Sequence, residues 1–176
     1  SALFFLFFFF SSRRRHTRFA LVSWARRCVS EPESRLHQGC VLTPHAGEFA
    51  RLAPDLAEAA QGEASDAKAE ATRAAAERFG CTVLLKGAET CIATPEGEVM
   101  CHRAEGARAA PWLATAGAGD VLAGFITGLL AREIAPLEAA ALATWLHVET
   151  ARRHGPGLIA EDLPELLPSV LREVLP

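Results

Sequence analysis

The stretch Pro111–Gly124, P-W-L-A-T-A-G-A-G-D-V-L-A-G, joins a glycine-rich turn to the start of a helical pattern. The turn Ala116-Gly117-Ala118-Gly119 leads directly into Asp120. Glycines let the backbone approach an anion closely, and the first amides of a helix have no partner within it. With the helix macrodipole, these amides favour a phosphate at the turn. Asp120 is then placed to take a proton from a hydroxyl that receives phosphate.

An ordinary helix cap is the alternative for this turn, because Asp is a preferred N-cap residue and glycines are common in turns. A second motif upstream favours the phosphate interpretation. In Leu42–Leu52, L-T-P-H-A-G-E-F-A-R-L, a short apolar run ends at Thr43 before Pro44, and His45 and Glu48 follow on a strand-to-helix loop. A histidine and an acid on such a loop are suited to a site near the phosphate turn.

A third motif lies in Cys81–Pro95, C-T-V-L-L-K-G-A-E-T-C-I-A-T-P. A leucine-rich strand delivers Lys86 and Gly87 to a turn, and a second strand begins near Thr90. A phosphate site needs a cation, and a lysine followed by glycine at a strand end supplies one. A solvent-facing lysine is the alternative for Lys86, and a loop histidine without a ligand is the alternative for His45.

Taken together, the motifs T-P-H-x-G-E, L-K-G-A-x-T and L-A-T-A-G-x-G-D-V-L-A-G resemble those of the ADP-dependent NAD(P)H-hydrate dehydratases. These enzymes belong to the ribokinase-like superfamily. The resemblance implies an α/β fold, a ribokinase-like three-layer sandwich. It covers residues 39–176, so we expect this chain to hold only the C-terminal part of the domain and to lack activity by itself.

The resemblance also implies roles for individual residues. His45 would contact the hydrated nicotinamide substrate, and Asp120 would contact the substrate and act as the catalytic base. Glu48 would hold a magnesium-bound water, with capping of the turn after Pro44 as its structural alternative. The residues expected to bind nucleotide are Lys86, Gly87, Ala88, Glu89, Thr90, Gly117, Ala118 and Gly119.

The implied reaction is repair of NADH or NADPH that has been hydrated on the ring. The enzyme would phosphorylate the 6-hydroxyl with ADP, or with ATP, in the presence of Mg²⁺, and loss of phosphate would restore the dihydronicotinamide. The family also implies homo-oligomers for full-length members and an NAD(P)H-hydrate epimerase as a fused or separate partner.

Three alternatives stay open. One is a small-molecule kinase of the same superfamily, which would share the glycine turn and the acid. The second is an inactive fragment that only binds nucleotide. The third is a truncated translation product without function.

Composition excludes some classes of partner. Half of the 176 residues are hydrophobic and the formal net charge is −3, which is typical of a globular protein and disfavours nucleic acid or an anionic membrane as partner. The five cysteines include no C-x-x-C pair, so a disulfide framework is not expected and a cytoplasmic location is favoured.

Residues 1–38 are interpreted as a non-native or artefactual segment without an assigned fold. Its first part, F-F-F-F-S-S-R-R-R-H-T-R-F, resembles a translated sequencing adapter. Its apolar run is too short to span a bilayer, and its arginines follow that run instead of preceding it as in a secretory signal. A membrane-surface tail is the alternative.

The spacing of apolar residues and the positions of glycine and proline predict the helices and strands of residues 39–176. A strand is expected to end at Thr43, and three consecutive strands are expected at Cys81–Lys86, Thr90–Thr94 and Val99–His102. Ser65 is expected to cap a helix that ends before Gly80, and Pro136 to open another.

The same patterns predict the surroundings of several single residues. Lys68 is expected on a solvated helix face, and His147 at a surface or helix end. Gly124 and Gly128 are expected to allow close packing against a neighbouring backbone. The last segment, Glu161–Leu175, is expected to be a helix broken near Pro168.

Overall fold

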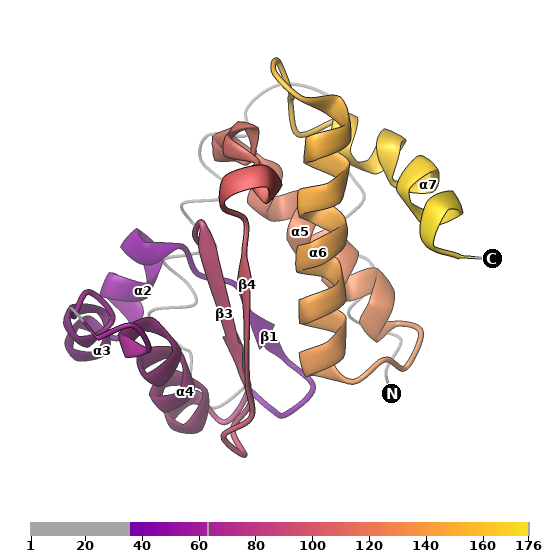
Figure 1. Cartoon of the computed structure of the whole chain (residues 1–176). Coiled ribbons are helices and arrows are strands. Elements are labelled where there is room, and N and C mark those ends of the chain that lie inside the picture. The colour runs from indigo at the N-terminus through magenta and orange to yellow at the C-terminus, as the bar shows by residue number, and fades with distance from the viewer. Residues whose placement is uncertain (1–35, 63, 176) are drawn as a thin grey trace, which may run out of the picture. The chain divides into compact units, whose positions relative to one another are not determined.

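A mixed four-stranded sheet forms the centre of the domain (Figure 1). The computed structural model describes residues 36–62 and 64–175, so most of the segment 1–38 lies outside the described residues. The strands lie in the order β1-β2-β3-β4. β1 pairs with β2 in parallel, and the other neighbours are antiparallel. The strand bounds are β1 Val41–Leu42, β2 Thr82–Leu85, β3 Glu89–Ala93 and β4 Val99–Arg103.

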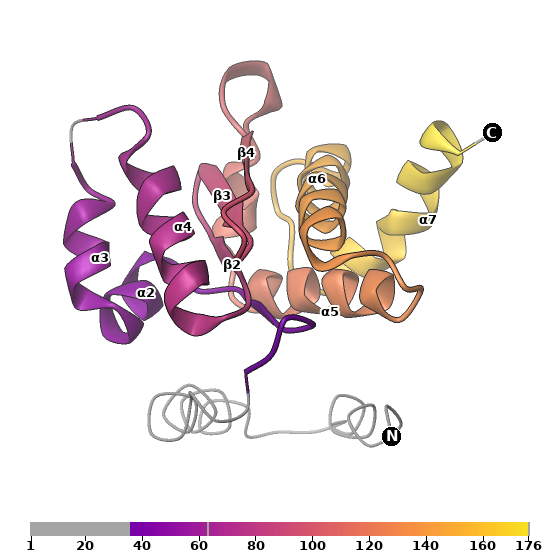
Figure 2. The same cartoon turned by 90° about the horizontal axis from the view of Figure 1, so that it is seen from below.

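Helices cover both faces of this sheet, which makes three layers (Figures 1 and 2). One face carries α2, α3 and α4, and the other carries α5, α6 and α7. Short 3₁₀ turns at Gly106–Arg108 and Pro111–Ala114 connect β4 to α5. This arrangement confirms the predicted α/β three-layer class. The helix bounds are α2 Ala46–Leu52, α3 Pro54–Ala59, α4 Ala67–Phe79, α5 Ala118–Leu130, α6 Pro136–His154 and α7 Asp162–Val174.

Alternation along the strands divides the core into two apolar layers. Val83 and Leu85 of β2 pack with Phe49 and the alanines of α4, whereas Leu84 packs with residues of α5 and α6. Because successive side chains of a strand point to opposite faces, a strand that is buried throughout serves both layers. The continuous apolar run T-V-L-L is the sequence pattern expected of such a strand. The buried strand β2 therefore fixes the position at which Lys86 follows the sheet.

The predicted strands are confirmed to within one or two residues, but two predictions about helix ends are wrong. The N-cap of α4 is Asp66, not Ser65, and no side chain there bonds a helix amide. α7 is not broken at Pro168 but runs through it. Leu163 and Val170 are both buried, so packing holds the helix on each side of the proline. Pro164 and Pro168 are exposed, which lets the carbonyl freed by the missing N–H reach water.

The predicted close packing at the glycines of α5 is also wrong. Gly124 and Gly128 are exposed, and within the described part of the chain a Cβ on either would meet no atom within 4 Å. Gly80 has equally open surroundings but a φ of 61°, and it ends α4 in the left-handed conformation. The two glycine environments therefore differ in backbone conformation and not in available space.

This difference predicts opposite effects of one substitution. Gly124→Ala should raise the free energy of unfolding by roughly 0.5–1 kcal/mol, because alanine restricts the unfolded chain and suits a helix interior. Gly80→Ala should lower it by about 1 kcal/mol, because a Cβ disfavours positive φ. Urea unfolding of both variants measures the pair, and a change of the same sign in both would contradict this account.

Candidate functional site

The loop after β1 places His45 and Glu48 at the start of α2. His45 is the N-cap, and its Nδ1 accepts hydrogen bonds from the amides of Gly47, at 3.0 Å, and Glu48, at 3.2 Å. In return, Glu48 Oε2 accepts from the His45 amide at 2.8 Å, which completes a capping box. The capping role that the sequence left open for Glu48 is therefore present. Because Nδ1 is an acceptor, the ring proton of His45 lies on Nε2.

Lys86 follows directly after β2 and connects two of the predicted motifs. Its amide donates to the carbonyl of Pro44 at 2.9 Å, which holds the two strand-end loops together. Its Nζ lies 3.7 Å from Glu48 Oε2, and the lysine side chain is only 24% exposed. A partly dehydrated ammonium group beside one carboxylate keeps donors available for a second anion.

Lys68 of α4 supports the turn that follows Lys86. The Lys68 ammonium donates to the carbonyl of Lys86 at 3.3 Å and to the carbonyl of Glu89. A Cβ at Gly87 would lie 2.6 Å from Lys68 Nζ, so this position accepts only glycine without a shift of the lysine. Thr90 closes the turn, because its hydroxyl donates to the Gly87 carbonyl at 3.0 Å.

The prediction that Lys68 lies on a solvated surface is therefore wrong. It is half-buried, and burial lowers the pKa of its amine, which the charge of Glu89 partly opposes. Lys68 has the same helical spacing as other charged residues of α4, so the spacing alone did not reveal that Lys68 is half-buried. A signal did exist in composition, because Lys68 and Lys86 are the two lysines of the whole chain. Both support the same turn.

The glycine turn forms the first turn of α5. Gly117, with a φ of 87°, is the N-cap, and its carbonyl accepts from the amides of Asp120 at 3.0 Å and Val121 at 3.2 Å. The amide of Gly119 has no acceptor among the described residues. A Cβ at Gly119 would lie 3.1 Å from Lys86 Nζ. The ammonium group therefore lies close to Gly119, and a cation close to a residue with a free amide suits an anion.

A buried histidine supports this turn from α6. His147 is 7% exposed, and its Nε2–H donates to the Ala118 carbonyl at 2.9 Å, while Phe125 packs against it edge-on. Burial lowers the pKa of His147 to about 4, and the charge of Lys86 acts in the same direction. The prediction of a surface position is wrong. Ala143 and Ala151, one turn away on either side, are fully buried, and this spacing was the signal for a buried His147.

The three predicted motifs thus meet at the amine of Lys86. Glu48 Oε2 lies 3.7 Å from it, and a Cβ on Gly119 would lie 3.1 Å from it. Two of the predicted side chains remain apart from it: within the described ranges, neither Asp120 nor Glu89 forms a hydrogen bond or ion pair with Lys86 or His45. Asp120 is exposed in the first turn of α5. The Glu89 carboxylate pairs with Arg103 at 2.6 Å, so of this residue only the carbonyl belongs to the turn.

Comparison with known proteins gives a consistent result. Residues 24–169 match the family model described as NAD(P)H-hydrate dehydratase, and the match begins upstream of Gly39. The chain is 41% identical over 138 residues to the bifunctional NAD(P)H-hydrate repair enzyme Nnr of Salinibacter ruber, which covers 76% of the chain and 24% of that protein. It is 38% identical over 143 residues to the ADP-dependent (S)-NAD(P)H-hydrate dehydratase of Cenarchaeum symbiosum, covering 77% of the chain and 45% of that protein.

Solved structures extend the similarity to the fold. The ADP/ATP-dependent NAD(P)H-hydrate dehydratase of Bacillus subtilis, co-crystallised with ATP and Mg²⁺ and soaked with CoA, superposes with a TM-score of 0.65 at 31% identity. That superposition covers 76% of this chain and 48% of the Bacillus chain. The chain therefore spans less than half the length of each of these three relatives. Along the described part of the chain, none of the helices has the length and apolar character needed to cross a membrane.

The burial of His147 predicts a loss of stability in acid. Its pKa is about 4 in the folded chain and 6.5 in the unfolded chain, so the unfolded chain binds more protons between these values. The free energy of unfolding should fall as the pH drops from 6.5 to 4, by up to about 3 kcal/mol from this group. His147→Gln should make the decline shallower, as measured by urea unfolding at several pH values. The exposed His37 provides the control His37→Gln, and an equal change in both variants would contradict the assignment.

Proposed function

Because this chain belongs to the NAD(P)H-hydrate dehydratase family, we propose that its site takes part in the nucleotide-dependent dehydration of hydrated NADH or NADPH. One observation carries the proposal: the Lys86 ammonium lies 3.7 Å from the Glu48 carboxylate and close to Gly119 in the glycine turn that starts α5. Cation, free amide and helix N-terminus together favour the phosphates of a nucleotide.

The chemistry explains why a nucleotide is needed. Hydroxide is a poor leaving group, so water does not leave the hydrated ring readily. ADP can transfer a phosphoryl group to the 6-hydroxyl, and phosphate then departs as a proton is lost from the ring. The two steps release AMP and phosphate and restore the dihydronicotinamide.

In this proposal Asp120 takes the proton from the 6-hydroxyl as the phosphorus–oxygen bond forms. The Lys86 ammonium and the Gly119 amide stabilise the charge on the phosphoryl group. His45 can only donate from Nε2 while its Nδ1 caps α2, so it is suited to hydrogen-bond an oxygen of the substrate. The residues assigned to nucleotide are those of the Lys86 turn and the Gly117–Gly119 turn.

Glu48 fits a contact with a magnesium-bound water better than direct coordination. Its carboxylate already accepts from the His45 amide and lies 3.7 Å from the Lys86 ammonium, which would repel a bare cation. Its remaining lone pairs can still accept hydrogen bonds from a coordinated water. Mg²⁺ would neutralise phosphate charge when bound. The Salinibacter relative is a bifunctional NAD(P)H-hydrate repair enzyme, which supports an epimerase as fused or separate partner.

The phosphate role of Lys86 predicts a loss of ADP affinity on Lys86→Met. Removing one charge-assisted contact should weaken ADP binding by roughly 10- to 100-fold, measured by calorimetry on the full chain. Arg132→Met removes an exposed charge next to the end of α5 and is the matched control, for which no change is expected. Equal affinity in the wild-type chain and Lys86→Met would remove the observation on which the proposal rests.

The base role of Asp120 predicts a different pattern. Asp120→Asn should leave ADP affinity within about threefold but lower any turnover that the wild-type chain supports by roughly 10²- to 10⁴-fold, because only proton transfer is lost. Turnover is followed as the recovery of NADH absorbance from its hydrate. Asp66→Asn, at another exposed helix start, is the control.

The same assay separates the alternatives. A stable phosphorylated product would indicate a small-molecule kinase of the superfamily. ADP binding without turnover in the wild-type chain, unchanged by Asp120→Asn, would indicate a nucleotide-binding fragment.

A further inference from the structure

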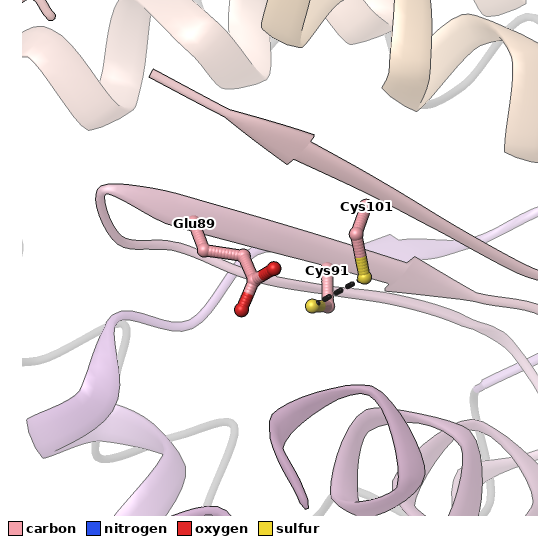
Figure 3. A group of neighbouring side chains, drawn as sticks. All are labelled: Glu89, Cys91 and Cys101. Carbon is pink, nitrogen blue, oxygen red and sulfur yellow. Dashed lines mark hydrogen bonds between the residues drawn. The ribbon is translucent and has the colours of Figure 1, made fainter. Parts of the chain in front are cut away.

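Cys91 of β3 and Cys101 of β4 lie directly opposite each other in the antiparallel pair. Their Sγ atoms are 2.6 Å apart (Figure 3). A covalent S–S bond measures about 2.05 Å, so the two sulfur atoms lie close to bonding distance. Figure 3 shows both side chains on the same side of the hairpin, together with Glu89.

The register of the hairpin places these two residues at a favourable backbone position. The amide of Thr94 donates to Glu98, and that of Ala104 donates to Ala88, so these opposite residues form hydrogen-bonded pairs. Such pairs alternate with non-hydrogen-bonded ones, and Cys91–Cys101 is of the second kind. Their Cα atoms are therefore expected about 4.5 Å apart, within the roughly 4.4–6.8 Å that a disulfide spans.

The two thiols differ in access. Cys91 is fully buried, whereas Cys101 is exposed. Burial, together with the hydrogen bond to Cys101, raises the pKa of the Cys91 thiol well above its usual range. An oxidant can therefore reach the sulfur of Cys101 from solvent, with the buried sulfur of Cys91 directly behind it.

We propose that Cys91 and Cys101 form a redox modification site, which a peroxide converts into a cross-strand disulfide. The Cys101 thiolate attacks a peroxide oxygen, the O–O bond breaks, and the departing hydroxide takes up a proton to become water. The sulfur of Cys91 then attacks the sulfenic sulfur of Cys101 and displaces its oxygen, which leaves with the Cys91 proton as a second water. The thiols lose two electrons in total, and the peroxide gains them.

A metal site is the competing interpretation of the same group. The ligand atoms of Glu89, Cys91 and Cys101 all lie within 4.8 Å of one another. Two thiolates on one tetrahedral Zn²⁺ are separated by about 3.7 Å, farther than the 2.6 Å seen here. Glu89 is paired with Arg103, and the Lys68 ammonium, which donates to the Glu89 carbonyl, adds a second positive charge near the group. The geometry and the charges therefore favour the disulfide.

Peptide mapping after exposure of the reduced full chain to hydrogen peroxide tests the proposal. Trypsin cleaves after Lys86 and Arg103, so both cysteines fall in one peptide, residues 87–103. We expect this peptide to lose the mass of two hydrogen atoms and to resist alkylation until it is reduced. A glutamate-specific protease, which cuts after Glu96 and Glu98, should leave two pieces that separate only on reduction.

Two variants and a stability measurement accompany the mapping. Cys101→Ser changes an exposed side chain and should abolish the mass loss, whereas Cys81→Ala, at a buried cysteine outside the pair, should retain it. Closing the loop should raise the unfolding midpoint of the oxidised chain by roughly 5 °C.

Two results would overturn the proposal. One is oxidation of Cys101 to a sulfinic acid while Cys91 still alkylates in the unfolded chain. The other is protection of both thiols from peroxide by one equivalent of Zn²⁺.

Discussion

The ammonium group of Lys86 is partly dehydrated and lies 3.7 Å from the Glu48 carboxylate and close to Gly119, and this placement depends on how its backbone is held. The amide of Lys86 donates to the Pro44 carbonyl, which fixes the backbone of the lysine. β2 is buried along its whole length, so its end is fixed by the core, and the position of the lysine is fixed with it. The site therefore depends on the central strand more than on any loop.

Two polar residues outside the motifs keep the backbone of the site in place. Lys68 donates hydrogen bonds to the carbonyls of Lys86 and Glu89 from the α4 side of the sheet, and His147 donates one to the Ala118 carbonyl from the other side. Each donates to carbonyls, and among the described residues the amide of Gly119, next to Ala118, stays without an acceptor. A free amide of this kind fits the proposed anion site.

Sequence alone could predict the parts of the molecule that depend on local pattern. The strands flanking Lys86 follow from β-branched and leucine-rich runs, and the start of α6 follows from Pro136, because these signals are confined to a few residues. The continuity of α7 could not be predicted this way, because buried contacts at Leu163 and Val170 outweigh the local effect of Pro168. The roles of Lys68 and His147 were missed for the same reason, since each depends on a carbonyl that the chain brings near only when it folds.

The hydrogen bond from the Lys86 amide to the Pro44 carbonyl also bears on the order of assembly. This hydrogen bond joins the two segments that precede and follow helices α2, α3 and α4 in the chain. The parallel pairing of β1 with β2 joins the same two segments. Non-local contacts of this kind form only after the entropy of closing the intervening loop has been lost. A chain with only its β3–β4 hairpin and helices formed would have the residues of the motifs without the contacts of the proposed site. A nucleotide bound at that proposed site would therefore favour the fully paired sheet over such partly folded forms.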